Sequence, residues 1–284
     1  MSTNVLFDAP GPRTVVRHRI YAVVTLVVLA LLLGYAIKRL YDEGQFAYAL
    51  WEPFVTPDYV RALLVDGLLE TLKMAFTAII GAVVFGAFFG IGKLSDHRFV
   101  RWPCWAVVEF FRAIPVLLLM VFIWYALGIQ KDSSSYWAVV IALTLYNGAV
   151  LAEVLRAGVL AVPKGQAEAA YAIGLRKSQV MNIVLLPQAV KIMLPAIISQ
   201  CVVALKDTAL GQYVIAPGLT AVSKQIYLAF ANRIPTIIVV AAAYIVVNLI
   251  LTWLATWAQK RFVGEKDVLV VPMVGAADAD SGRA

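Results

Sequence analysis

Residues Met74–Gly92 read MAFTAIIGAVVFGAFFGIG, a stretch that contains no Asp, Glu, Lys or Arg. The hydrocarbon core of a bilayer is about 30 Å thick, and a helix needs about 20 mostly apolar residues to cross it. Inside lipid every backbone N–H and C=O group must find its partner within the protein, so a single apolar segment of this length has to be helical. The stretch therefore predicts a transmembrane α-helix.

The composition of the whole chain agrees with a membrane environment. Of the 284 residues, 62% are hydrophobic and 14% are charged, whereas soluble proteins average about 45–50% apolar and about 25% charged residues. Four further uncharged runs are long enough to span a membrane: Ile20–Ile37, Ala113–Gln130, Ser133–Ala152 and Ile234–Gln259. We therefore expect an all-α integral membrane protein.

A sixth apolar segment, Ile183–Leu205, is less regular because it carries Lys191 and is interrupted by Pro187 and Pro195. We expect a broken or kinked helix that faces the protein interior, since irregular backbone at membrane depth must be satisfied by protein or by water. The uncharged stretch Thr208–Ser223 contains two glycines and a proline, which favour a short re-entrant or interfacial piece. The prediction is about six transmembrane helices.

The 24 Lys and Arg residues indicate the orientation of these helices. They lie singly between apolar runs and form no basic stripe, so the net charge of +7 does not indicate a nucleic-acid partner. Most of them fall in segments 13–19, 93–101, 156–191 and 260–283, which lie on one side of the membrane if six helices cross it. By the positive-inside rule we expect a multi-pass protein of the cell (plasma or inner) membrane with both termini in the cytoplasm.

The sequence has no pattern typical of an enzyme or a metal site. HExxH and GxSxG are absent, and Cys104 and Cys201 lie in apolar segments without CxxC spacing, so we expect both to be packing residues. Segment 87–94, AFFGIGKL, lacks the first glycine of a phosphate-binding loop and the Ser or Thr after its lysine. Gly86 and Gly90, four residues apart, predict instead a face of small residues that lets another helix approach closely. We expect no cofactor and no metal bound by this chain.

The longest predicted loop on the basic side, Arg156–Lys191, reads RAGVLAVPKGQAEAAYAIGLRKSQVMNIVLLPQAVK. Pro163 can open a helix, the alanines within 167–172 favour one, and Gly174 offers a left-handed stop. Ser178 can cap the helix that follows. We expect a short surface helix, which needs a partner because isolated helices below about 12 residues are marginal in water.

This loop resembles the EAA loop of bacterial ABC importer permeases. The family pattern E-A-A-x3-G-x9-I-x-L-P is met at Glu168, Ala169, Ala170, Gly174 and Val184–Pro187, with Val184 in place of isoleucine. Segment Phe111–Pro115, FRAIP, resembles the FRGTP of the polar amino acid branch and departs from it at two positions. Other residues similar to this branch, which includes histidine and glutamine permeases, are Asn147, Ala152–Glu153, Arg156–Gly158, Gly165–Gln166 and Lys206–Leu210.

The resemblance covers about Leu64–Phe262 and implies a domain organisation. Residues 64–262 would form the five-helix permease domain, with its coupling loop at about 160–180. Residues 1–19 would be a cytoplasmic tail, 20–41 an additional N-terminal transmembrane helix, and 263–284 a disordered cytoplasmic tail. Permeases of actinobacterial glutamate importers resemble this chain in having such a helix and tail, which implies L-glutamate as substrate; a permease for polar amino acids in general is the alternative.

In that family the EAA loop forms a coupling helix that docks in a cleft of an ATP-hydrolysing subunit. The resemblance implies that this chain transmits motion and is not an enzyme, since ATP and Mg²⁺ would be held by the partner ATP-binding subunits. It further implies a second homologous permease subunit in a heterodimer, and an extracellular or periplasmic amino-acid-binding protein. The implied coupling residues are Gly165, Glu168, Ala169, Ala170 and Gly174. The alternative is a solvated loop whose alanines merely favour helix.

Charged residues at membrane depth are costly, so each is a candidate for a functional role. Glu153 and Arg156 lie three residues apart and can pair with each other, or Glu153 can belong to an internal gate. Lys206 and Asp207 end the irregular helix, where they can cap it or brace two subunits. Arg112 can extend to the lipid headgroups.

A transported amino acid is zwitterionic and needs a polar path through the bundle. Asn147 and Gln200 are candidates for hydrogen bonds to it, and Lys206 or Lys191 can supply the cation that an acidic substrate requires. A different class of protein, a self-sufficient secondary transporter or channel not driven by ATP, would need internal repeats or a chain of intramembrane acids, and neither is apparent. A structural membrane anchor would not require a helical loop between its spans.

Overall fold

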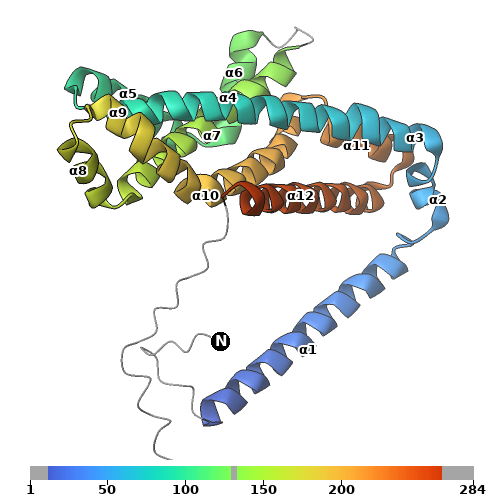
Figure 1. Ribbon diagram of the computed structural model, residues 1–284. Coiled ribbons are helices and arrows are strands. Elements are labelled where there is room, and N and C mark those ends of the chain that lie inside the picture. The colour runs from blue at the N-terminus through green and yellow to red at the C-terminus, as the bar shows by residue number, and fades with distance from the viewer. Residues whose placement is uncertain (1–11, 129–132, 264–284) are drawn as a thin grey trace, which may run out of the picture. The chain divides into compact units, whose positions relative to one another are not determined.

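The computed structural model describes residues 12–128 and 133–263 (Figure 1). In this part of the chain the regular structure is helical and no strand occurs. The longer helices are α1 (Pro12–Asp42), α4 (Glu70–Lys93), α5 (Arg98–Ala113), α6 (Val116–Leu127), α7 (Ser134–Ala161), α8 (Lys164–Ala172), α10 (Leu186–Asp207), α11 (Leu219–Phe230) and α12 (Arg233–Val263). The short ones are α2 (Tyr48–Trp51), η1 (Glu52–Phe54), α3 (Pro57–Arg61), η2 (Ala62–Leu69), α9 (Lys177–Gln179), η3 (Val180–Leu185) and η4 (Thr208–Val214).

The chain divides into two compact units, and the first comprises residues 1–60 and 224–239. Its main element is α1, the expected N-terminal helix, which begins earlier than predicted, at Pro12. None of the most apolar part of α1 is buried in the protein, so lipid is the environment that its side chains require. Elsewhere in this unit, the Asn232 side-chain amide donates to the Leu50 carbonyl (2.8 Å), and the rings of Tyr59 and Phe230 meet edge to face.

The second unit, residues 61–223 and 240–284, is organised around the pair α4 and α7, which share more contacts than any other two helices. Gly86 and Gly90 of α4 face α7, because a β-carbon at Gly86 would lie 2.7 Å from Leu151 Cβ. A β-carbon at Gly90 would lie 2.9 Å from the Ala152 carbonyl oxygen. The predicted close approach at these two glycines is confirmed.

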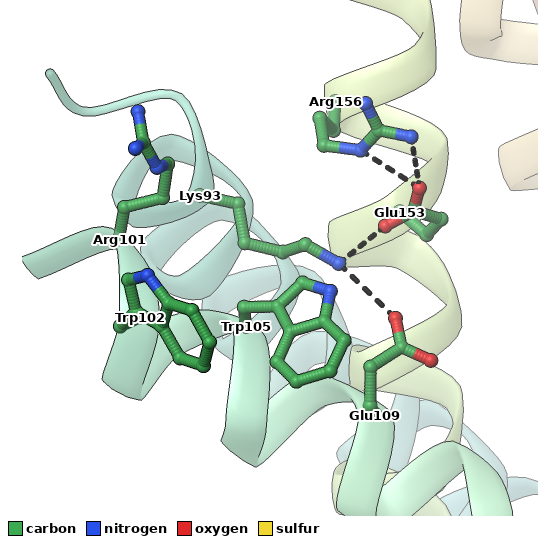
Figure 2. Close-up of a pocket in the computed structure, with 7 residues that line it drawn as sticks. All are labelled: Lys93, Arg101, Trp102, Trp105, Glu109, Glu153 and Arg156. Carbon is green, nitrogen blue, oxygen red and sulfur yellow. Dashed lines mark hydrogen bonds and ion pairs between the residues drawn. The ribbon is translucent and has the colours of Figure 1, made fainter. Parts of the chain in front are cut away.

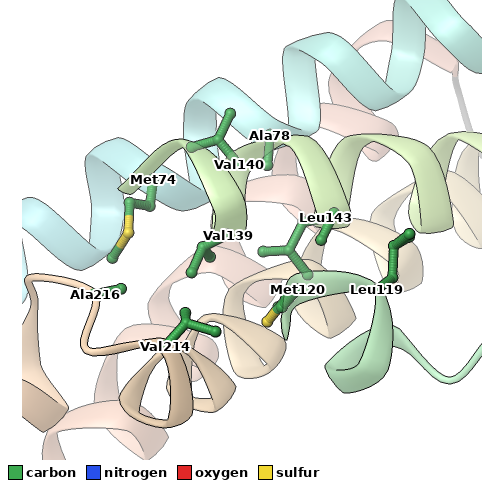
Figure 3. Packing of buried hydrophobic residues seen from close by; sticks show 10 residues of the cluster. Met74, Ala78, Leu119, Met120, Val139, Val140, Leu143, Val214 and Ala216 are labelled. Carbon is green, nitrogen blue, oxygen red and sulfur yellow. The ribbon is translucent and has the colours of Figure 1, made fainter. Parts of the chain in front are cut away.

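Apolar side chains from α4, α6 and α7 form the largest buried cluster of this unit. Figure 3 shows Met74 and Val139 converging on Val214, which belongs to η4, while Met120 of α6 packs beside Leu143. Met74, Met120 and Leu143 are each at most 1% exposed. The cluster fixes the helices whose ends carry the polar groups described below.

The span expected at Ala113–Gln130 is wrong in its details. The helix that begins there, α6, ends at Leu127 and is preceded by α5, and the two are bent by 102° at a short break. The cause is Pro115, which disfavours helical backbone at the residue before it, and Ile114 is indeed extended (φ −85°, ψ 128°). Gln130 lies outside the described residues. Among residues 12–128 and 133–263, five helices are long and apolar enough to span a membrane, or six if the bent pair counts as one span, in agreement with the predicted fold class.

The sixth segment is continuous and not broken. Pro187 is the second residue of α10, directly after the π-helical turn η3, and α10 continues through Pro195. The irregularity lies ahead of the prolines, in the π-helical turn η3. Only 6% of the most apolar part of this segment is buried. The chain's own helices therefore do not enclose it, contrary to the expectation that it faces the protein interior. Of the short piece predicted at Thr208–Ser223, the first part is a 3-10 helix, η4, which ends at Val214, and the last residues belong to α11.

Candidate functional site

The loop that follows α7 folds into α8, as the sequence predicts. Pro163 stands just before the helix with extended backbone (ψ 131°). At the other end Gly174 is left-handed (φ +84°), its N–H donates to the Tyr171 carbonyl (2.9 Å), and the Leu175 N–H donates to the Ala170 carbonyl (3.2 Å). These two bonds form a Schellman motif, which needs a left-handed residue that glycine adopts without steric cost.

One side of α8 is exposed in the described chain. The exposed residues in and just after the helix include Gly165, Glu168, Ala169, Tyr171, Ile173 and Gly174. Ile173 is 79% exposed, which is unusual for a large apolar side chain unless a partner or lipid covers it. Ala170 is different, because it is 4% exposed and packs α8 onto its own chain. Sequence reasoning missed Tyr171 and Ile173, whose apolar character beside the exposed alanines was the available signal.

Two polar contacts connect the loop between α7 and α10 to neighbouring elements. The Lys177 ammonium pairs with the carboxylate of Asp96, which lies in the turn between α4 and α5, and α8 and this turn lie at the same end of the unit (Figure 1). The hydrogen bond from Lys177 lowers the pKa of the Asp96 carboxyl below its ordinary value. The Gln188 side-chain amide donates to Gln166 Oε1 (3.4 Å), which connects α10 with α8.

The prediction that Ser178 caps the helix after the loop is wrong. Ser178 lies inside α9, and the residue that precedes the helix is Arg176. The Arg176 backbone N–H donates to Gln179 Oε1 (2.9 Å), so a side chain of the first helical turn satisfies this N–H group at the helix start. Serine is in general a preferred capping residue, but here the bond between Arg176 and Gln179 caps the helix instead.

A cluster of ion pairs joins α4, α5 and α7. Lys93 Nζ lies 2.5 Å from Glu153 Oε2 and 3.4 Å from Glu109 Oε1 (Figure 2). Arg156 holds the other Glu153 oxygen through Nε (2.7 Å), and Arg112 Nη1 contacts Glu109 (3.1 Å). The Lys93 side chain is 4% exposed, so this cation is buried among its partners. The cluster therefore holds three helices together through charges that are costly to separate.

The sequence predicted part of this cluster. The pairing of Glu153 with Arg156 is confirmed, whereas Arg112, expected to extend to headgroups, pairs with Glu109 instead. Lys93 was missed. Its signal was present, because it follows Gly90 by three residues on the face of α4 that approaches α7.

Asn147 and Gln200 are brought together between α7 and α10. Gln200 Nε2 donates to Asn147 Oδ1 (2.5 Å), and Asn147 Nδ2 donates to the Leu143 carbonyl (2.9 Å). Asn147 is 1% exposed. Both polar atoms of Asn147 are thus engaged inside the protein, which makes this pair an interhelical bond in the present conformation.

A groove of about 390 Å³ lies between the end of α10 and the middle of α12. Lys206 lines it, whereas Asp207 is not among its lining residues. Asn248 also lines it and is 9% exposed; its Nδ2 donates to the Tyr244 carbonyl (2.7 Å), but its buried Oδ1 has no partner within the described chain. A buried acceptor without a donor is costly, so Asn248 is a candidate for an interaction that the described chain does not itself supply. Sequence reasoning missed Asn248, which lies in an otherwise apolar span.

No group of His, Cys, Asp or Glu in the described residues is arranged to hold a metal ion. Cys104 and Cys201 are free thiols, and Cys104 is buried. The polar features described above are thus α8, the ion-pair cluster, the Asn147–Gln200 pair and the groove.

Comparison with known proteins places these features in a family. The family model of the binding-protein-dependent transport system inner membrane component matches residues 82–264. The glutamate transport system permease protein GluD of Corynebacterium glutamicum is 41% identical over 77% of this chain and 82% of its own. The arginine transport system permease protein ArtQ of Bacillus subtilis is 32% identical over 70% of this chain and 91% of its own.

Solved structures agree with the sequence relatives. The crystal structure of an amino acid ABC transporter with histidines superposes with a TM-score of 0.67 at 29% identity, over 72% of this chain and 95% of that chain. The inward-facing MetNI methionine ABC transporter superposes with a TM-score of 0.61 at 26% identity, over 73% and 98%. The chain thus belongs to the binding-protein-dependent transport system inner membrane components, the permease subunits of ABC importers.

Proposed function

We propose that this chain is the membrane subunit of an ATP-driven importer of polar amino acids, with L-glutamate as substrate. The observation that carries the proposal is α8, a projecting helix with Glu168 and Ala169 exposed, which ends in the glycine stop at Gly174. The 41% identity with a glutamate transport system permease supports the choice of substrate.

In this proposal α8 docks in a cleft of a separate ATP-binding subunit. The exposed alanine allows close approach, Glu168 pairs with a basic group of the partner, and Tyr171 and Ile173 supply apolar contact area. The ties from Asp96 to Lys177 and from Gln188 to Gln166 would pass a displacement of α8 to α4, α5 and α10. ATP and Mg²⁺ stay on the partner, and this chain catalyses no reaction.

The assembly would contain a second homologous permease and an amino-acid-binding protein on the outer side. The chain would sit in the cell membrane with α8 and both termini in the cytoplasm. A second permease would also cover α10, whose apolar surface this chain leaves largely exposed.

For the substrate we propose the groove of Lys206 and Asn248. The exposed Lys206 can hold the side-chain carboxylate of glutamate, and a rotation of the Asn248 side chain would turn its unpartnered Oδ1 toward the ammonium group of the amino acid. Asn147, Gln200, Glu153 and Asp207 remain candidates for the path or gate in other conformations of the transport cycle.

Uptake by reconstituted vesicles tests the function. Vesicles that contain this chain, its partner permease and the ATPase should accumulate labelled glutamate only with internal ATP and external binding protein. Glu168→Lys should abolish uptake while the chain still inserts into the membrane. The matched control Glu52→Lys, at an exposed site distant from Glu168 in the sequence, should leave uptake unchanged. Normal uptake by Glu168→Lys, or uptake without the ATPase, would contradict the proposal, and the second result would indicate a secondary transporter.

Substrate choice has its own test. Competition of labelled glutamate by glutamine, arginine and histidine ranks the substrates directly. Lys206→Gln should raise the KM for glutamate about tenfold, as expected for the loss of one charge-assisted contact, and change that for glutamine much less. Equal changes for both amino acids would contradict the binding of the side-chain carboxylate by Lys206.

A further inference from the structure

The ion-pair cluster opens into a pocket of about 520 Å³ that the transport function leaves unexplained. The pocket is lined by Lys93, Arg101, Trp102, Trp105, Glu109, Glu153 and Arg156. Figure 2 shows both indole rings on α5, with Arg101 beside them and Arg156 on the facing helix α7. Cations and exposed tryptophans thus share one cavity.

The charges of the pocket do not cancel. Its two acids are already engaged, Glu153 by Lys93 and Arg156, and Glu109 by Lys93 and Arg112. Arg101 forms no salt bridge within the described chain, and it is exposed. Asp96 lies outside the pocket, and Arg101 also lowers the pKa of its carboxyl group. This carboxylate is already paired with Lys177. The pocket keeps an unneutralised positive charge at its mouth.

The apolar side of the pocket has the chemistry of a membrane surface. Trp102 is 54% and Trp105 49% exposed, and the Arg98 guanidinium lies over the Trp102 ring at 5.7 Å. Phe99, one turn ahead on α5, is 95% exposed. Tryptophan and arginine side by side are typical of the level of the lipid headgroups, where one end of the ring is apolar and the other wet. The positive-inside pattern places this end of α4, α5 and α7 at the cytoplasmic leaflet, which carries anionic lipids.

We propose that this pocket binds the headgroup of an anionic phospholipid. Arg101 and the free edge of Arg156 hold the phosphate, while Trp102 and Trp105 contact the glycerol and the first part of the acyl chains. The bound lipid completes the charge balance of the cluster that joins α4, α5 and α7, so it stabilises their contact. Basic pockets between helices on the cytoplasmic side are known to take such headgroups.

Quenching of tryptophan fluorescence by brominated lipids tests the site. The full-length chain in detergent micelles is titrated with brominated phosphatidylglycerol or, in parallel, brominated phosphatidylcholine. We expect saturable quenching at several-fold lower mole fraction of the anionic lipid, and loss of that component in the double variant Trp102→Phe and Trp105→Phe, which separates these two rings from the other five tryptophans.

Three variants separate the pocket from general attraction of lipid to a basic protein. Arg101→Gln should raise the lipid mole fraction at half-saturation about fivefold, because one Lys or Arg side chain near an anionic membrane surface contributes about that factor to the binding constant. Arg101→Lys should restore most of the affinity, and Arg261→Gln, at the end of α12, should leave it unchanged. Equal quenching by both lipids, or no response to Arg101→Gln, would overturn the proposal. Displacement of the lipid by millimolar inorganic phosphate or glycerol 3-phosphate would also overturn it, in favour of a site for free anions.

Discussion

Removing Glu153 should destabilise the protein more than removing Lys93, although the two residues form one ion pair. Lys93 has a 4% exposed side chain, and in Glu153→Leu it would keep only Glu109 at 3.4 Å. Glu153 is 24% exposed, and in Lys93→Met it would keep Arg156 at 2.7 Å. The first variant leaves a buried cation with one distant partner, and the second leaves a partly exposed carboxylate that Arg156 still holds.

The magnitudes follow from these environments. Breaking a buried pair by removing one partner costs about 3–5 kcal/mol in soluble proteins, whereas polar contacts inside membranes average about 0.6 and reach about 1.7 kcal/mol. We expect about 2–3 kcal/mol for Glu153→Leu and about 1 kcal/mol for Lys93→Met. The double variant should cost less than the sum, with a coupling energy of about 1 kcal/mol.

Reversible unfolding in SDS, followed by intrinsic fluorescence, measures these free energies. The exposed pair Lys73 and Glu70 is the control, because Lys73→Met and Glu70→Leu should change the unfolding free energy little. A larger cost for Lys93→Met than for Glu153→Leu would contradict this prediction. So would a coupling energy below about 0.3 kcal/mol, which is the level of independent sites.

Three further predictions concern the helix contact and the loop. Gly90→Val should cost about 1–3 kcal/mol in the same unfolding assay, because its β-carbon would meet Leu155 Cδ2 at 2.8 Å, whereas Gly34→Val, with nothing within 4 Å, should cost far less; equal costs would contradict the close approach. Gly174→Val should cost about 1–2 kcal/mol locally and speed hydrogen exchange in α8, since its left-handed backbone and not its surroundings opposes the side chain; unchanged exchange would place the turn elsewhere. Because the pKa of Asp96 is lowered from its ordinary value of 3.8, its pairing with Lys177 should contribute fully above that pH and be lost as the pH falls below it. Asp96→Asn should therefore lower the protection factor of amide exchange in the helix that begins with α9 at pH 7. The wild-type protection factor there, which is corrected for the intrinsic pH dependence of exchange, should not change between pH 6 and 8; the opposite of either result would remove this contact.

Much of the fold could be predicted from local patterns. The absence of charge over Met74–Gly92 defines a span by itself, because the cost of a charge in lipid acts on each residue separately. The stop at Gly174 and the start near Pro163 depend on backbone preferences that hold in any context. The close approach at Gly86 and Gly90 follows from side-chain size alone.

The features that escaped prediction depend on residues far apart in the chain. The contact of Lys93 with Glu153 joins positions 60 residues apart, and its geometry needs the packing of α4 on α7. The groove at Asn248 depends on how α10 and α12 meet. The bend at Pro115 had a local signal, which the count of uncharged residues overrode in the prediction of a single span.

Site-directed cross-linking from Ala169 tests the central claim, that α8 couples this permease to an external motor. Ala169→Cys is placed in a background without Cys104 and Cys201, and Ala170→Cys, whose position is 4% exposed, is the matched control. Position 169 should cross-link to the ATP-binding subunit in the intact complex and react with an impermeant thiol reagent only from the cytoplasmic side, while position 170 should react poorly. Labelling of position 169 from the outer side, or its reaction with lipid-soluble reagents alone, would contradict the claim.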